Sequence, residues 1–112
     1  MRSEVRRSSP SPWTVIVLFG DLDLGALPGL RRVLSGLDAA TGRHVLVDLD
    51  SVDTLSPEAL GVLLGAAARA RRDGGDLRLV TGLEHHLELL RWSGVDRAVR
   101  VAPTVGAAID TA

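Results

Sequence analysis

The sequence predicts an α/β fold: a mixed sheet of four to five strands with about four helices, mostly on one face. Three observations predict it. Residues 13–19 form a near-continuous apolar run with β-branched side chains, residues 45–65 pass from an apolar strand through a tight turn into a helix, and strand-like and helix-like segments alternate with short connections. A chain of 112 residues is long enough for one core, so we expect a single domain over residues 1–112.

The N-terminal segments predict two strands. Residues 4–7 can form a short edge strand, and the Ser/Pro-rich stretch that ends at residue 12 is typical of a flexible turn, because proline cannot donate to a strand ladder. The apolar run at 13–19 predicts a strand that is buried on both faces.

The remaining segments continue the alternation. In order, the pattern predicts a helix over about 24–37 capped by Asp23, a strand over 44–49, a helix over about 57–73, a strand over 77–80, a helix over 84–92, a strand over 98–101 and a short helix that begins near Pro103. Gly74-Gly75 and Gly94 are typical stops for the helices that precede them.

Composition excludes several classes of protein. The chain has no cysteine, so disulfides and thiolate metal sites are excluded, and no stretch approaches the roughly 18 apolar residues that cross a bilayer. The first residues lack the apolar region of a signal peptide, and we expect a cytoplasmic protein. Thirteen arginines are balanced by 14 acids, and only Trp13, Phe19 and Trp92 could stack on bases, so nucleic-acid binding is not expected. Trp92 is predicted to anchor the core or its rim.

The turn before the helix at 57–73 carries strong helix-start signals. Ser56 occupies the N-cap position, Pro57 the first helical position and Glu58 the first turn. Each feature favours an ordinary helix start by roughly 0.3–1 kcal/mol. A helix N-terminus at the surface also presents N–H groups and a positive dipole end that attract a carboxylate or phosphate. The same turn is therefore a candidate binding site, and both interpretations can hold together.

Other polar residues favour structural roles. Asp48, Asp50 and Asp53 alternate near the end of a strand and could suggest Mg²⁺ or carboxylate catalysis, but no phosphate cradle accompanies them. His85 and His86 point about 100° apart on a helix and have no suitably spaced third ligand, so we expect exposed polar residues and no metal site.

Four segments resemble the STAS domain, in particular the bacterial anti-sigma factor antagonists. Residues 20–23 look like the family's Gly-Glu-Leu-Asp, and residues 45–64 look like its strand, turn and helix. Residues 73–77 resemble the Gly-Gly helix stop, and residues 89–95 the end of the third helix. The likeness extends over almost the whole chain, from about residue 4 to residue 112.

The chain departs from the family at the phosphorylation motif, Asp-Ser-Ser-Gly-Leu-Gly. Ser56 and Pro57 fall on the aspartate and the first serine. Glu58 falls on the serine that a partner kinase phosphorylates, and Ala59 falls on the glycine. The acceptor hydroxyl is therefore replaced by a permanent, phosphomimetic negative charge at this degenerate phosphorylation site. We expect Glu58 to make binding independent of phosphate in one of two ways: it either locks the chain in a phosphorylated-like state or suits a partner that accepts an acidic residue.

The resemblance implies a regulatory protein that is not an enzyme and holds no cofactor. In the family, the unphosphorylated antagonist binds an anti-sigma factor, usually a GHKL-type serine kinase, and thereby controls sigma-factor-dependent transcription. We expect the partner to contact Asp21, Asp23, Asp53, Thr54, Ser56, Pro57, Glu58, Ala59, Leu60 and Gly61. The loop 52–58, the helix start at 57–64 and the turn at 20–24 would form that surface. A homodimer is left open as a further association.

Three alternatives stay open. The chain could be a non-catalytic STAS subunit of a larger complex, such as an ABC-type lipid transporter. It could also be a weak nucleotide-binding module, although it lacks a glycine-rich cradle. Finally, Ser56 or Thr54 could accept a phosphate in place of the missing serine.

Overall fold

The computed structural model describes residues 1–7, 12–36 and 44–110, and it confirms the α/β fold class. The elements in order are β1 (Arg2–Arg7), β2 (Trp13–Leu22), the 3₁₀ helix η1 (Leu24–Ala26), α1 (Leu27–Ser35), β3 (His44–Leu55), α2 (Pro57–Arg72), β4 (Asp76–Val80), α3 (Glu84–Ser93), α4 (Val95–Ala98), β5 (Val101–Ala102) and α5 (Val105–Asp110). The Ser/Pro turn predicted before residue 12 lies for the most part outside the described residues.

The five strands of the described chain form one mixed sheet in the order β1-β2-β3-β4-β5. β1 pairs with β2 in the antiparallel direction, and the remaining neighbours are parallel. The N-terminal strand lies at the edge, as the sequence predicts. Each parallel connection carries at least one helix, which is the usual way to join parallel strands.

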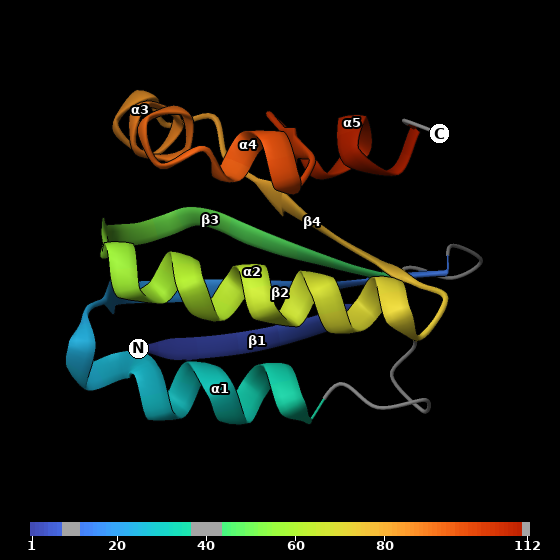
Figure 1. The fold of residues 1–112 in the computed structure, drawn as a ribbon, viewed down its shortest axis with the longest axis horizontal. Coiled ribbons are helices and arrows are strands. Elements are labelled where there is room, and N and C mark those ends of the chain that lie inside the picture. The colour runs from blue at the N-terminus through green and yellow to red at the C-terminus, as the bar shows by residue number, and fades with distance from the viewer. Residues whose placement is uncertain (8–11, 37–43, 111–112) are drawn as a thin grey trace.

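β2 is buried on both faces, as its apolar run predicts. Ile16 and Leu18 point into a large core, whereas Val15 and Val17 point into a smaller core on the opposite face. The large core also takes residues from α1, α2, α3 and α4, and the small core takes Ala108 of α5. Figure 1 shows α1 and α2 side by side across one face of the sheet. The helices therefore lie mostly on one face, with α5 on the other.

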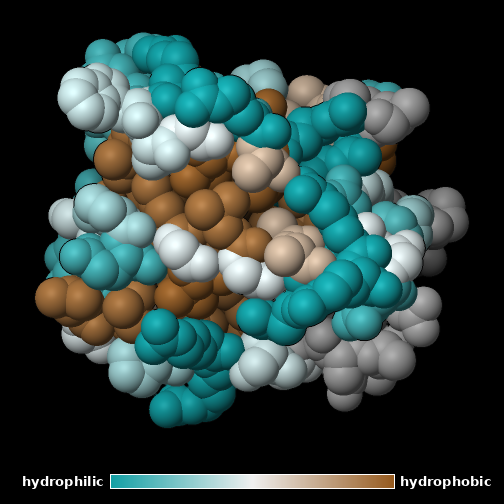
Figure 2. Space-filling model, in the orientation of Figure 1, coloured by the Kyte–Doolittle hydropathy of each residue, from teal (hydrophilic) through white to brown (hydrophobic). Residues whose placement is uncertain are grey.

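Figure 2 shows that the helices leave part of the apolar side chains on this face of the molecule uncovered. Apolar side chains remain visible between α2 and the α3–α4 segment, and hydrophilic residues frame them. None of the described helices is long and apolar enough to cross a membrane.

The strand predicted over 44–49 is six residues longer than expected and ends at Leu55. The loop predicted at 52–58 is therefore wrong in its bounds: Ser56 alone joins the end of β3 to the start of α2. β2 continues beside this segment and pairs Gly20 with Val52 and Leu22 with Leu55, so the backbone of the polar stretch is still satisfied. Val52 and Leu55 are buried, which fixes the register despite the polar residues between them.

Two further boundaries differ from the prediction. Residues 24–26 form a 3₁₀ turn, and α1 begins only at Leu27, because Pro28 occupies the first turn of α1 and has no N–H to donate. The predicted strand 98–101 is shorter and begins at Val101. The short helix α4 (Val95–Ala98) takes up the first residue of the predicted strand, and it ends where the Val99 N–H donates to the Val95 carbonyl at 2.8 Å.

Candidate functional site

β3 leads directly into α2 through a single residue, Ser56. Its backbone is extended, with φ −80° and ψ 153°, and its N–H donates to the carbonyl of Leu22 on β2 at 2.9 Å. Its hydroxyl oxygen accepts a hydrogen bond from the Ala59 N–H at 3.2 Å. Ser56 therefore acts as the N-cap of α2, and the end of β2 fixes its position.

The first turn of α2 separates exposed residues from buried ones. Pro57 and Glu58 are exposed, whereas Ala59 and Leu60 are 0% and 2% exposed. The two buried residues hold the helix start on the sheet and are not accessible to a partner. Glu58 forms no ion pair with any residue in the described part of the chain, so its carboxylate lies at the surface in the field of the helix N-terminus.

The ends of β2 and β3 bring further acids to the same end of the sheet. Asp21 lies beside Thr54 in the pairing register. Asp23 follows at the end of β2, and its carboxylate accepts a hydrogen bond from the Ala26 N–H at 3.1 Å. Asp53 lies on β3, and all of these side chains are exposed. We call the four carboxylates of Asp21, Asp23, Asp53 and Glu58 the acidic surface.

A shallow groove of about 480 Å³ lies between α1 and α2, next to Glu58. Arg31 on α1 and Arg69 on α2 also line it. Its α2 side includes Gly61, where an added Cβ would meet no atom within 4 Å. The sequence analysis missed this groove. The signal was present, because the spacing of Glu58, Gly61 and Gly65 places the three residues on one side of a helix.

Two residues of α3 differ from expectation. His86, predicted to be exposed, is 1% exposed, and its Nε2 lies 2.7 Å from the Val52 carbonyl on β3. Trp92, predicted to anchor the core or its rim, is 91% exposed. Helical spacing explains both results: His86 and Leu90 are four residues apart and face the core, whereas Trp92 lies about 200° around the helix from Leu90.

Asp48, Asp50 and Asp53 lie along the second half of β3. Among the described residues, no group of three or more His, Asp or Glu side chains is placed to hold a metal ion. Asp50 instead accepts a hydrogen bond from the Gly82 N–H at 2.8 Å and ties β3 to the residues after β4.

The cap gives a direct test of the helix start. Ser56→Ala removes the acceptor for the Ala59 N–H and should lower the free energy of unfolding by about 1 kcal/mol, as measured by urea denaturation. Ser51→Ala makes the same change at an exposed position of β3 and should shift stability by less than about 0.5 kcal/mol. Equal losses in the two variants would contradict the capping role.

Comparisons with known proteins agree with this architecture. The structure resembles an anti-sigma factor antagonist from Mycobacterium paratuberculosis, with a TM-score of 0.85 and 18% identity over 98% of this chain and 94% of that one. It also resembles the anti-sigma factor antagonist SpoIIAA from Bacillus in its unphosphorylated form, with a TM-score of 0.77 and 18% identity over 97% of this chain and 94% of that one.

The same fold occurs in a transporter. A sulfate transporter family protein from Wolinella succinogenes matches with a TM-score of 0.76 and 17% identity over 92% of this chain and 86% of that chain. At these identities the likeness concerns the fold. A sequence comparison with curated proteins finds no significant match.

A family profile described as "Mlab, STAS domain" matches residues 5–103. The matched region begins in β1 and ends just after β5, and it includes β3, Ser56 and the whole of α2. The chain therefore belongs to the STAS domain family.

Proposed function

We propose that this chain is an anti-sigma factor antagonist-like regulator, which binds an anti-sigma factor of the GHKL serine-kinase type and so controls sigma-factor-dependent transcription. Its acidic surface and the groove beside α1 would make the contact. It works by docking and is not an enzyme. We place it in the cytoplasm, where such a partner acts.

One observation carries the proposal: Glu58 is exposed on the first turn of α2, immediately after the strand that delivers this helix to the surface. The resemblance aligns this position with the phosphorylated serine of the family. A phosphoserine carries about −1.5 to −2 charges and three acceptor oxygens, whereas a glutamate carries one charge on a planar group. Glu58 would therefore supply part of that charge permanently, without a kinase.

The surroundings of Glu58 support an electrostatic contact. Three further carboxylates lie at the same end of the sheet, and no cation of the described chain forms an ion pair with Glu58. A partner that docks here must bring basic groups. Clustered surface charges mainly raise the association rate and suppress wrong partners. The acidic surface would thus select the partner and keep binding independent of phosphorylation.

Glu58→Ser tests this proposal. The variant restores the hydroxyl of the family motif and removes the charge that attracts basic groups, so its affinity for a cognate anti-sigma factor should be about tenfold weaker than that of the wild type, measured by calorimetry. Glu88→Ser makes the same change at an exposed position of α3 and should leave the affinity unchanged. Identical affinities of the wild type and Glu58→Ser would contradict the proposal that Glu58 supplies a permanent charge in place of the phosphate.

Phosphorylation of Ser56 or Thr54 is the competing mechanism at the same turn. The Ser56 hydroxyl already accepts the capping hydrogen bond from Ala59, which opposes its modification. We expect no phosphopeptide from residues 44–69 by mass spectrometry after incubation with a cognate kinase. A modified peptide would show that this chain is regulated by phosphorylation after all.

A second candidate function is a STAS subunit of an ABC-type lipid transporter. The matching family profile carries the description Mlab, and a transporter shares the fold, which favours it. A pull-down separates the two functions. Recovery of a GHKL-type kinase supports the first, and recovery of an ABC ATPase supports the second.

A further inference from the structure

β1 (Arg2–Arg7) lies at the edge of the sheet, and only one of its two sides is paired in the described part of the chain. In Figure 1, β1 is the outermost strand on the side of α1. An open edge presents a row of N–H and C=O groups that can pair with another extended strand. Charged side chains along an edge can oppose such pairing or direct it, so the order of the charges decides which strand fits.

The side chains of β1 alternate between the two faces of the sheet. Glu4 and Arg6 lie on the face of the small core, where the Arg6 Nε donates to the Glu4 Oε1 at 2.9 Å. Their side chains are 51% and 60% exposed. Val5 lies on the other face, opposite Ile16 of β2, and is 49% exposed. The edge therefore carries an acid and a base on one face, with an exposed apolar residue between them on the other.

Two copies of β1 can pair about a two-fold axis in only a few registers. Opposite residues of paired strands share a face of the sheet, so the axis must pass through one residue, which then lies opposite itself. An axis through Glu4 or Arg6 would set that charge against its own copy, and like charges directly opposite are destabilising. An axis through Ser3 would pair residues 2–4 only. An axis through Val5 sets the two valines opposite each other and places Glu4 of each copy against Arg6 of the other.

We propose that a second copy of this chain pairs with β1, antiparallel and centred on Val5, so that the two sheets join into one. Each copy contributes the same edge, which is the usual symmetry of a homodimer. The seam forms a Glu4–Arg6 pair on each side of the axis and covers the exposed valines. Because the seam is short, we expect a weak dimer.

The two-fold axis reverses the strand direction, so the acidic surfaces of the two copies lie at opposite ends of the dimer. Asp21 follows the β2 residue opposite Val5 by five positions, beyond the residues of β2 that pair with β1. The seam therefore leaves both acidic surfaces open, and the inference does not rest on the proposed function.

Sedimentation equilibrium of the full chain tests the pairing. Between about 10 µM and about 1 mM, the average mass should rise from that of one chain toward that of two. Glu4→Arg sets base against base at both charge pairs, and Arg6→Glu sets acid against acid, so each variant alone should dimerise about tenfold more weakly. An equimolar mixture of the two variants sets bases of one strand against acids of the other and should recover dimerisation. That recovery is specific to the register centred on Val5.

Matched variants control for the change in net charge. Glu88→Arg on α3 and Arg72→Glu on α2 make the same changes at exposed positions away from β1 and should leave dimerisation unchanged. Thermal unfolding checks that the variants are folded, which we expect because the exposed Glu4–Arg6 pair contributes little to stability.

Four results would overturn the proposal. They are a wild-type chain that stays monomeric over the whole concentration range, a dimer that Glu4→Arg or Arg6→Glu leaves intact, a mixture of these two variants that stays monomeric, and equal losses in the control variants. A dimer that each β1 variant weakens and their mixture restores would establish the seam.

Discussion

Replacing Leu63 by alanine is expected to lower the free energy of unfolding by about 2–5 kcal/mol. Leu63 is 0% exposed and packs into the large core from the middle of α2. The substitution removes its buried methyl groups and leaves a cavity that the surrounding side chains cannot fully close. Because domains of this size are stable by only about 5–15 kcal/mol, urea denaturation should show a markedly lower midpoint.

Leu24→Ala is the matched control for that measurement. Leu24 lies on η1 beside the acidic surface and is 66% exposed, so the same substitution should change stability by less than about 0.5 kcal/mol. An equal loss in both variants would mean that α2 does not pack on the sheet as described. Leu63 matters for function as well, because it anchors the helix whose first turn presents Glu58.

The second large effect is an acid sensitivity that His86 introduces. The Val52 carbonyl can only accept, so the imidazole donates from Nε2, and Nδ1 is unprotonated. Nδ1 is buried and has no hydrogen-bond partner in the described structure. Burial lowers the pKa of His86 below its ordinary value of 6.5, and the nearby His85 lowers it further, whereas the Val52 hydrogen bond and Asp50 act in the opposite direction.

The sign of the effect follows from proton linkage. Below pH 6.5 the unfolded chain binds a proton that the buried imidazole still excludes, so stability is full above that pH and falls as the pH drops toward the lowered pKa. We expect the urea midpoint to decrease between about pH 7.5 and about pH 5.5.

Two substitutions isolate the contribution of His86. His86→Gln keeps a donor for the Val52 carbonyl and cannot titrate, so it should flatten this pH dependence. His85→Gln changes the exposed neighbour and should retain it. An unchanged pH dependence in His86→Gln would show that another group titrates.

Most of the fold could be predicted because local signals agreed with the tertiary structure. The apolar run of β2 has only one stable placement, in the middle of a sheet that is covered on both faces. The start of α2 is marked three times over, by Ser56, Pro57 and Glu58, and the helix begins where they indicate. Gly94 has a positive φ of 78° and ends α3 as predicted.

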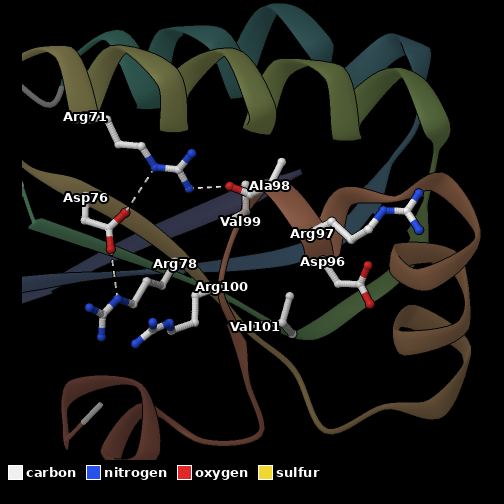
Figure 3. Close-up of a pocket in the computed structure, with 9 residues that line it drawn as sticks. All are labelled: Arg71, Asp76, Arg78, Asp96, Arg97, Ala98, Val99, Arg100 and Val101. Atoms are coloured by element: carbon white, nitrogen blue, oxygen red, sulfur yellow. Dashed lines mark hydrogen bonds and ion pairs between the residues drawn. The ribbon is translucent and has the colours of Figure 1, made fainter. Parts of the chain in front are cut away.

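The differences arise where tertiary contacts outweigh the local pattern. The polar residues at the end of β3 favour a turn, but pairing with β2 keeps them in a strand. His86 has a polar side chain, yet it is buried, and its Nε2 donates to the Val52 carbonyl on β3, which lies 34 residues earlier in the chain. A hollow lined by residues of α2, β4 and the α4–β5 segment (Figure 3) is a further example, because no spacing along the chain indicates that these segments meet.

The candidate site shows the same division. Sequence alone placed Ser56, Pro57 and Glu58 at the helix start, because those positions are local. Asp21 and Thr54 are far apart in the sequence, and only the parallel register of β2 and β3 brings them together. The groove between α1 and α2 likewise depends on how the two helices pack.

The central claim is that the fixed negative charge of Glu58 controls partner binding, and Glu58→Gln tests it most directly. Glutamine keeps the size and shape of the side chain and removes only the charge. Affinity for a cognate anti-sigma factor, measured at low and high salt, should fall by about tenfold at low salt and converge with the wild type as salt screens the charge. A Glu58→Gln variant that binds like the wild type at every salt concentration would contradict the account.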